Sequence, residues 1–135
     1  MKFRIILLSL TIAVQLPAAT VALLGRGEAG RNLADRIFAE GADLEFVERD
    51  RIAAVLQERR LNEKNLDSVA VRSLASLIKA DLFVLIDGKK DGSKGHLLIF
   101  ESNSGFRLAD EQLPTEGMEQ AALKLIRSKQ TLVAA

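Results

Sequence analysis

Three glycines near the start of the chain have the spacing of a nucleotide-binding turn. Gly25, Gly27 and Gly30 follow a short apolar run and precede a stretch with helical periodicity. In dinucleotide-binding folds such glycines let the backbone approach a pyrophosphate at a helix N-terminus, and an acid about 20 residues farther on binds the ribose hydroxyls. Glu48 stands at a suitable position for that acid. One hypothesis is therefore a protein that binds NAD or FAD through Gly25-x-Gly27-x-x-Gly30 and Glu48.

The other hypothesis, which we favour, is that these glycines form only a turn between a strand and a helix. Glu28 would place a carboxylate in the loop that should receive phosphate. Two helices and an antiparallel meander are expected after the second strand, where a dinucleotide fold would continue with another βαβ unit. Glycine's backbone freedom accounts for such a turn without a ligand.

The remaining residue types that could do chemistry do not form a recognisable site. His96 is the only histidine, and the chain contains no cysteine. Zinc usually requires several His or Cys ligands, so we expect no metal site and interpret His96 as an exposed strand residue. No serine has a histidine at a position that suggests a catalytic triad. We therefore expect no catalytic residue, no cofactor and no enzymatic activity.

The charge balance argues against nucleic acid as a partner. The chain has 19 basic and 18 acidic residues, whereas a nucleic-acid-binding domain normally has a strongly basic face. Lys89, Lys90 and Lys94 do cluster with Asp91 in an expected turn. We interpret this cluster as a solvated turn, with contact to an anionic surface such as phospholipid head groups as the alternative.

The first residues have the three zones of a cleavable export signal. Lys2 and Arg4 form a basic start, residues 5–14 are mainly apolar, and Ala18 and Ala19 supply the small residues that a signal peptidase requires. The apolar zone is shorter than the roughly 20 residues of a permanent membrane span. We therefore expect a signal peptide at residues 1–19, a domain at residues 20–135 and no membrane span after cleavage. Without cysteine we also expect no lipid anchor and no disulfide.

The rest of the chain predicts a single α/β domain with a mixed β-sheet, helices packed on the sheet, and the element order βαβααβββα. Strands are expected at residues 21–24, 44–48, 82–86, 97–100 and 106–113. Helices are expected where apolar stripes recur, at Leu33, Ile37 and Phe38; at Ile52, Val55 and Leu56; at Val71, Leu74, Ala75 and Ile78; and at Met118, Ala121, Ala122, Leu125 and Ile126.

Punctuating residues mark the ends of these elements. Gly41 is expected to end the first helix in a left-handed cap. Asp50 and Asp67 are expected as N-caps of the next two helices. Asn103-Ser104-Gly105 predicts a tight turn between strands. Residues 130–135 have no C-cap signal, so we expect either a frayed end or the remainder of a longer protein.

The segment at residues 46–61 resembles a signature of the curli-secretion (CsgG-like) family. Its relatives include envelope domains similar to the N-terminal domain of the Tol-system propeller protein and to lipoprotein activators of penicillin-binding proteins. Residues 77–86, with Ala80 and Asp81, and the strand-turn-strand at residues 97–113 are also similar to the family pattern. The resemblance implies structural roles, and no catalytic ones, for the following residues: Glu48, Arg49, Asp50, Leu56, Ala80 and Asp81.

The resemblance also implies a function in the cell envelope. It suggests a non-enzymatic domain, periplasmic or associated with the outer membrane, that docks to envelope proteins or to its own copies in an export or curli-type assembly. The chain lacks the lipidated cysteine and the transmembrane hairpins of curli channels, so we do not expect it to form a pore alone. The expected edge strand at residues 106–113 is the surface we associate with docking.

Overall fold

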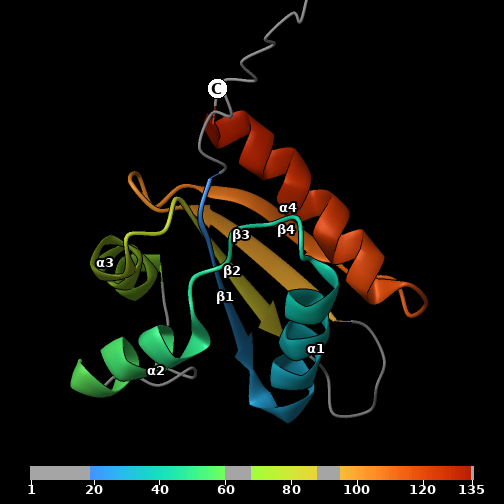
Figure 1. The fold of residues 1–135 in the computed structure, drawn as a ribbon. Helices are drawn as coiled ribbons and strands as arrows, with labels where there is room; N and C mark the ends of the chain where they lie inside the picture. Colours follow the sequence, from blue (N-terminus) through green and yellow to red (C-terminus); the bar gives the residue numbers. More distant parts are fainter. Residues whose placement is uncertain (1–18, 60–67, 88–94, 135) are drawn as a thin grey trace, which may run out of the picture.

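The computed structural model describes residues 19–59, 68–87 and 95–134, which form the α/β domain shown in Figure 1. The elements follow in the order β1 (Val21–Arg26), α1 (Gly27–Glu40), α2 (Arg49–Glu58), α3 (Ser68–Ile78), β2 (Leu82–Asp87), β3 (His96–Glu101), β4 (Arg107–Gln112) and α4 (Met118–Ala134). The expected α/β class with a mixed sheet and packed helices is confirmed. Residues 1–18, the Asp67 cap and the lysine cluster lie outside the described residues.

The sheet has the strand order β1-β2-β3-β4. β1 pairs with β2 in parallel, and β3 pairs antiparallel with β2 on one side and with β4 on the other. β2 is central and apolar because helices cover it on both sides, and its residues Leu82 to Ile86 are all buried. The β3–β4 ladder shifts register between Ile99 and Phe100, which leaves Leu108 as an extra residue on β4.

The strand expected at residues 44–48 is reduced to one bridge. Phe46 pairs with Val21 in parallel, outside the named strands. The Val21 N–H donates to the Glu45 carbonyl at 2.8 Å, and the Val47 N–H donates to the Val21 carbonyl at 2.9 Å. The pairing stops there because the chain turns into α2 at Arg49. The expected element order therefore holds with this strand shortened to one bridge.

Two hydrophobic cores lie on the two faces of the sheet. The first core, under α1 and α4, includes Leu33, Ile37, Val84, Leu97 and Ile126. The second core, under α2 and α3, joins Ile52, Leu74 and Ile78 to side chains of the opposite sheet face such as Phe83 and Phe100. Figure 1 shows α1 and α4 together on one side and α2 and α3 on the other. Burying each large aliphatic side chain contributes about 1.5–3 kcal/mol, so both layers stabilise the fold.

Two expectations about helix ends are wrong. Gly41 does end α1, but at φ −92° and ψ 45°, which is not left-handed. A Cβ there would approach Leu123 Cδ2 and Phe46 Cε2 to 2.9 Å, so packing explains the glycine. Asp50 lies inside the first turn of α2, and Glu48 is the N-cap, without a side-chain cap hydrogen bond. α4 continues to Ala134.

Candidate functional site

The glycine turn is explained by close packing between β1 and α1. Gly25 lies at the end of β1, and a Cβ on it would stand 2.2 Å from the carbonyl oxygen of Gly30 in α1. Gly27 begins α1 with φ +71°, a conformation that side chains other than glycine rarely adopt. Gly30 is buried in α1. The contact and the backbone conformation thus account for Gly25 and Gly27 without a phosphate ligand.

Glu48 does not occupy the position of a ribose-binding acid. The pairing beside β1 ends at the Val21–Phe46 bridge, whereas the glycines lie at the opposite end of β1. The Glu48 carbonyl accepts hydrogen bonds from the backbone N–H groups of Arg51 and Ile52, and its side chain is exposed. Strand, glycine turn and acid therefore lack the arrangement of a dinucleotide fold, and the geometry gives the NAD or FAD hypothesis no support.

A groove of about 310 Å³ lies between the end of β1 and α2. Its floor includes Leu23, Leu24 and Gly25. Three residues that carry the family resemblance, Arg49, Asp50 and Leu56, line its other side together with Ile52 and Ala53. Arg49 forms an ion pair with Asp35 of α1, so its guanidinium links α2 to α1. Arg49 thus contacts α1, while Asp50 and Leu56 line the groove, and the structural role that the resemblance implies for them stays a prediction.

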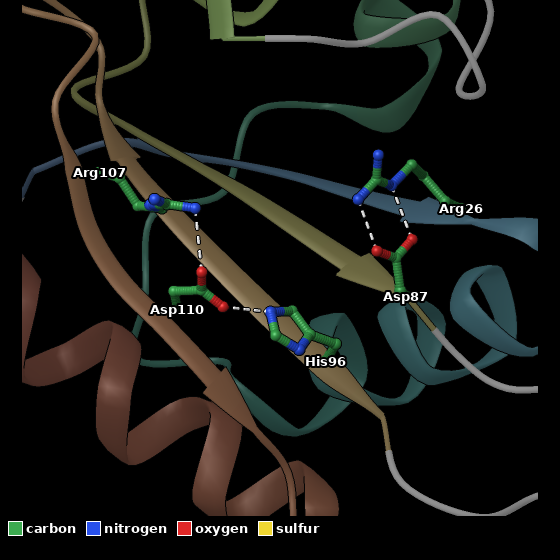
Figure 2. A network of polar contacts seen from close by, with 5 residues as sticks. All are labelled: Arg26, Asp87, His96, Arg107 and Asp110. Atoms are coloured by element: carbon green, nitrogen blue, oxygen red, sulfur yellow. Dashed lines mark hydrogen bonds and ion pairs between the residues drawn. The ribbon is translucent and has the colours of Figure 1, made fainter.

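A row of charged side chains crosses the sheet at the C-terminal ends of β1 and β2 (Figure 2). Arg26 on β1 donates two hydrogen bonds to the Asp87 carboxylate on β2, from Nε at 2.6 Å and from Nη2 at 2.5 Å. The two residues are directly paired in the parallel ladder. Both side chains are partly exposed, at 25% and 38%. This bidentate ion pair links the C-terminal ends of β1 and β2 next to the glycine turn.

Asp110 on β4 continues the row by binding two neighbours. Its Oδ1 contacts His96 Nε2 on β3, and its Oδ2 accepts a hydrogen bond from Arg107 Nη1 at 2.9 Å. Figure 2 shows both contacts on the same sheet face as the Arg26–Asp87 pair. In the described part of the chain no serine hydroxyl joins His96, and no group of three His, Cys, Asp or Glu residues could hold a metal.

His96 is half-buried, with a side chain that is 35% accessible, where an exposed residue was expected, and its partner Asp110 was not predicted. Counting back from the Asn103-Ser104-Gly105 turn pairs strand residues one by one. The register shift between Ile99 and Phe100 breaks that count. The His96–Asp110 contact can therefore be predicted from the sequence only if the position of this bulge is known.

β4 forms one end of the sheet and has an exposed outer side. Asp110, Glu111 and Gln112 are exposed, and Phe106, just before the strand, is 72% accessible. The Leu113 N–H bonds inward to the Gly95 carbonyl at 2.7 Å. Because inward and outward groups alternate along an antiparallel strand, Gln112 and Asp110 direct their backbone N–H and C=O groups away from β3. The expected edge position of this segment is confirmed.

The two last residues of the family resemblance lie at the start of β2. Ala80 is buried in the second core. The Asp81 carbonyl accepts a hydrogen bond from the Ser102 N–H at 3.1 Å, and its carboxylate accepts one from the Thr20 N–H at 2.8 Å. Asp81 thus connects the entry of β1 to the turn after β3.

One carboxylate outside the row has a shifted pKa. The Arg127 guanidinium of α4 donates two hydrogen bonds to Asp43, at 2.8 and 2.9 Å. These bonds hold the pKa of Asp43 below its ordinary value, and the carboxylate raises the pKa of Arg127. The pair links the segment after α1 to α4 at the surface.

The comparisons with known proteins give two structural likenesses. No protein-family model and no curated protein matches the sequence. The LpoB C-terminal domain from Escherichia coli is similar in structure, with a TM-score of 0.49 and 14% identity over 70% of this chain and 81% of that chain. The LpoB C-terminal domain from Salmonella enterica has a TM-score of 0.48 and 9% identity over 70% of this chain and 80% of that chain. The CsgG-like resemblance remains a prediction.

Among the helices of the described residues, none has the length and apolarity needed to cross a bilayer.

Proposed function

We propose that the chain is a non-enzymatic cell-envelope domain, periplasmic or associated with the outer membrane, that binds another envelope protein along the edge of β4. The observation that carries the proposal is the end position of β4, whose outward backbone groups and exposed Phe106 are accessible. An open strand edge can add a strand from a partner. The export signal pattern and the CsgG-like resemblance support the compartment.

The charges along β4 favour a different protein over a second copy as the partner. Antiparallel pairing of two copies of β4 centred on Asp110 or on Glu111 would place two carboxylates opposite each other, which destabilises a strand pair. Pairing centred on Ala109 would meet the bulge at Leu108 in both copies. The same features protect the edge against aggregation.

The partner segment that fits this edge is extended and basic, with an apolar side chain at one end. Asp110 already binds His96 and Arg107, whereas Glu111 is exposed and has no ion pair among the described residues. A lysine or arginine opposite Glu111 would complement it. An apolar side chain of the partner would cover Phe106.

The test is site-specific photo-crosslinking in the envelope of the native host. A photoreactive residue at Phe106 is expected to give a covalent product with one envelope protein, whereas the same residue at Lys124, on the exposed side of α4, gives none. Gln112→Pro removes an outward N–H and should abolish the product. Gln112→Ala keeps that N–H and should retain it.

Two outcomes would contradict the proposal. A product with the mass of two copies of this chain would show self-association instead. A product that survives Gln112→Pro would show that the partner does not pair with β4.

A further inference from the structure

The first residue of the expected mature chain is already bound by the folded domain. The Thr20 N–H donates a hydrogen bond to Asp81 Oδ2 at 2.8 Å, between residues 61 positions apart in sequence. The Thr20 carbonyl accepts hydrogen bonds from the N–H groups of Asp81 and Leu82, at 2.9 and 3.1 Å. Both backbone groups of Thr20 are therefore held by the start of β2.

The residues before and after Thr20 are held differently. Val21 is paired with Leu82 in the sheet and is also hydrogen-bonded to the segment around Phe46. The Ala19 carbonyl accepts a hydrogen bond from Gln130 Nε2 of α4 at 2.8 Å, and water can replace this hydrogen bond. Ala19 is buried but pairs with no strand, so removal of the chain up to Ala19 breaks no backbone hydrogen bond of the sheet, whereas a cut beyond Thr20 removes backbone bonds to β2.

We propose that cleavage of the export signal between Ala19 and Thr20 creates an ion pair between the new α-ammonium group of Thr20 and the Asp81 carboxylate. Hydrolysis by a signal peptidase adds water across the Ala19–Thr20 peptide bond. Ala19 leaves with a carboxylate, and the Thr20 nitrogen gains protons to become an ammonium group. Asp81, a residue of the family resemblance, thereby binds the processed N-terminus.

The chemistry of the nitrogen explains why cleavage strengthens this contact. Before cleavage the Thr20 nitrogen offers one neutral N–H to Asp81 Oδ2. After cleavage the same nitrogen carries a positive charge and three donors next to a carboxylate. Hydrogen bonds between two charged groups are stronger than those with one neutral partner. Because Asp81 is exposed, the gain is that of a surface ion pair.

The first test is the N-terminal sequence and intact mass of the protein purified from the envelope of an expressing bacterium. The expected first residue is Thr20. Any other first residue, or an uncleaved chain, overturns the inference. This test is independent of docking at β4, because cleavage and partner binding are measured separately.

The second test compares chains that begin at Thr20 or at Ala19, each released from a fusion by a protease that leaves no extra residue. Asp81→Asn is introduced into both. In the Thr20 chain it is expected to lower the melting temperature by about 2–4 °C. In the Ala19 chain the loss should be less than half as large, since the ammonium group has moved one residue away.

An equal loss in both chains would overturn the inference, because Asp81 would then act only on the backbone N–H. Asp50→Asn provides the matched control. Asp50 is an exposed carboxylate on α2, and its substitution should change both chains equally.

Discussion

The two faces of the sheet use the same four strands but differ in how much of each face is apolar. The face under α1 and α4 is apolar from β1 to β4 and is buried almost throughout. The face under α2 and α3 is apolar near Ala22 and Phe83 but carries Arg26, Asp87 and His96 at its other end. The helices cover only the apolar part. One face is therefore apolar across all four strands, while the other keeps a polar part accessible.

The largest expected contrast between the faces comes from two neighbouring leucines of β3. Leu97 is fully buried in the first core, and Leu98 is half-buried on the opposite face. Leu97→Ala should lower the free energy of unfolding by about 3–4 kcal/mol because it leaves a cavity. Leu98→Ala should cost about 1 kcal/mol. Urea unfolding of both variants measures the contrast, and equal losses would show that the second face is as well packed as the first.

A smaller effect is expected where α1 meets the first face. Gly25→Ala places a Cβ against the Gly30 backbone, which cannot move as freely as a side chain. We expect a loss of about 2–3 kcal/mol from the forced backbone shift. Gly27→Ala, where a Cβ meets no atom within 4 Å, should cost about 1 kcal/mol through its positive φ. Thermal unfolding of the two variants separates close packing from backbone conformation; a larger loss at Gly27 would refute this assignment.

The charged row on the second face should contribute less. Asp110→Asn weakens the contacts with His96 and Arg107, and both partners are partly exposed. We expect a loss of about 0.5–1 kcal/mol at low salt that shrinks in 1 M NaCl. Asn in place of Asp87 should behave in the same way at the Arg26 pair. A loss well above 2 kcal/mol, independent of salt, would mean that the row stabilises the fold as the buried core does.

The smallest effect concerns the pH dependence of stability at the Asp43–Arg127 pair. Because the pKa of Asp43 is lowered in the folded state, its stabilisation is complete above the ordinary value of 3.8 and is lost as the pH falls through the lowered folded-state pKa. Asp43→Asn should therefore remove a small part of the acid sensitivity below about pH 4 and leave the slope near neutral pH unchanged. Melting curves between pH 2 and 7 on buffers of about equal ionic strength test this. A changed slope near neutral pH would contradict it.

Much of the fold could be predicted because the apolar pattern is local. The continuous apolar run at β2 and the stripes that include Ile37, Leu74 and Ile126 are buried as expected. The helix ends were harder to predict. Gly41 is required by its contacts with the distant residues Leu123 and Phe46. Asp50 is not an N-cap because α2 begins one residue before it, at Arg49. The strand at residues 44–48 has suitable residues, but the turn into α2 limits its pairing to one bridge.

The glycine turn shows how far residue spacing alone can be interpreted. The spacing of Gly25 and Gly27 established that a strand turns tightly into a helix. It did not distinguish a phosphate site from close packing. The close packing of Gly25 became visible only in the folded domain, because the 2.2 Å approach to Gly30 is a contact between two elements. The same reason applies to the His96–Asp110 contact, which depends on a bulge in the ladder between two strands.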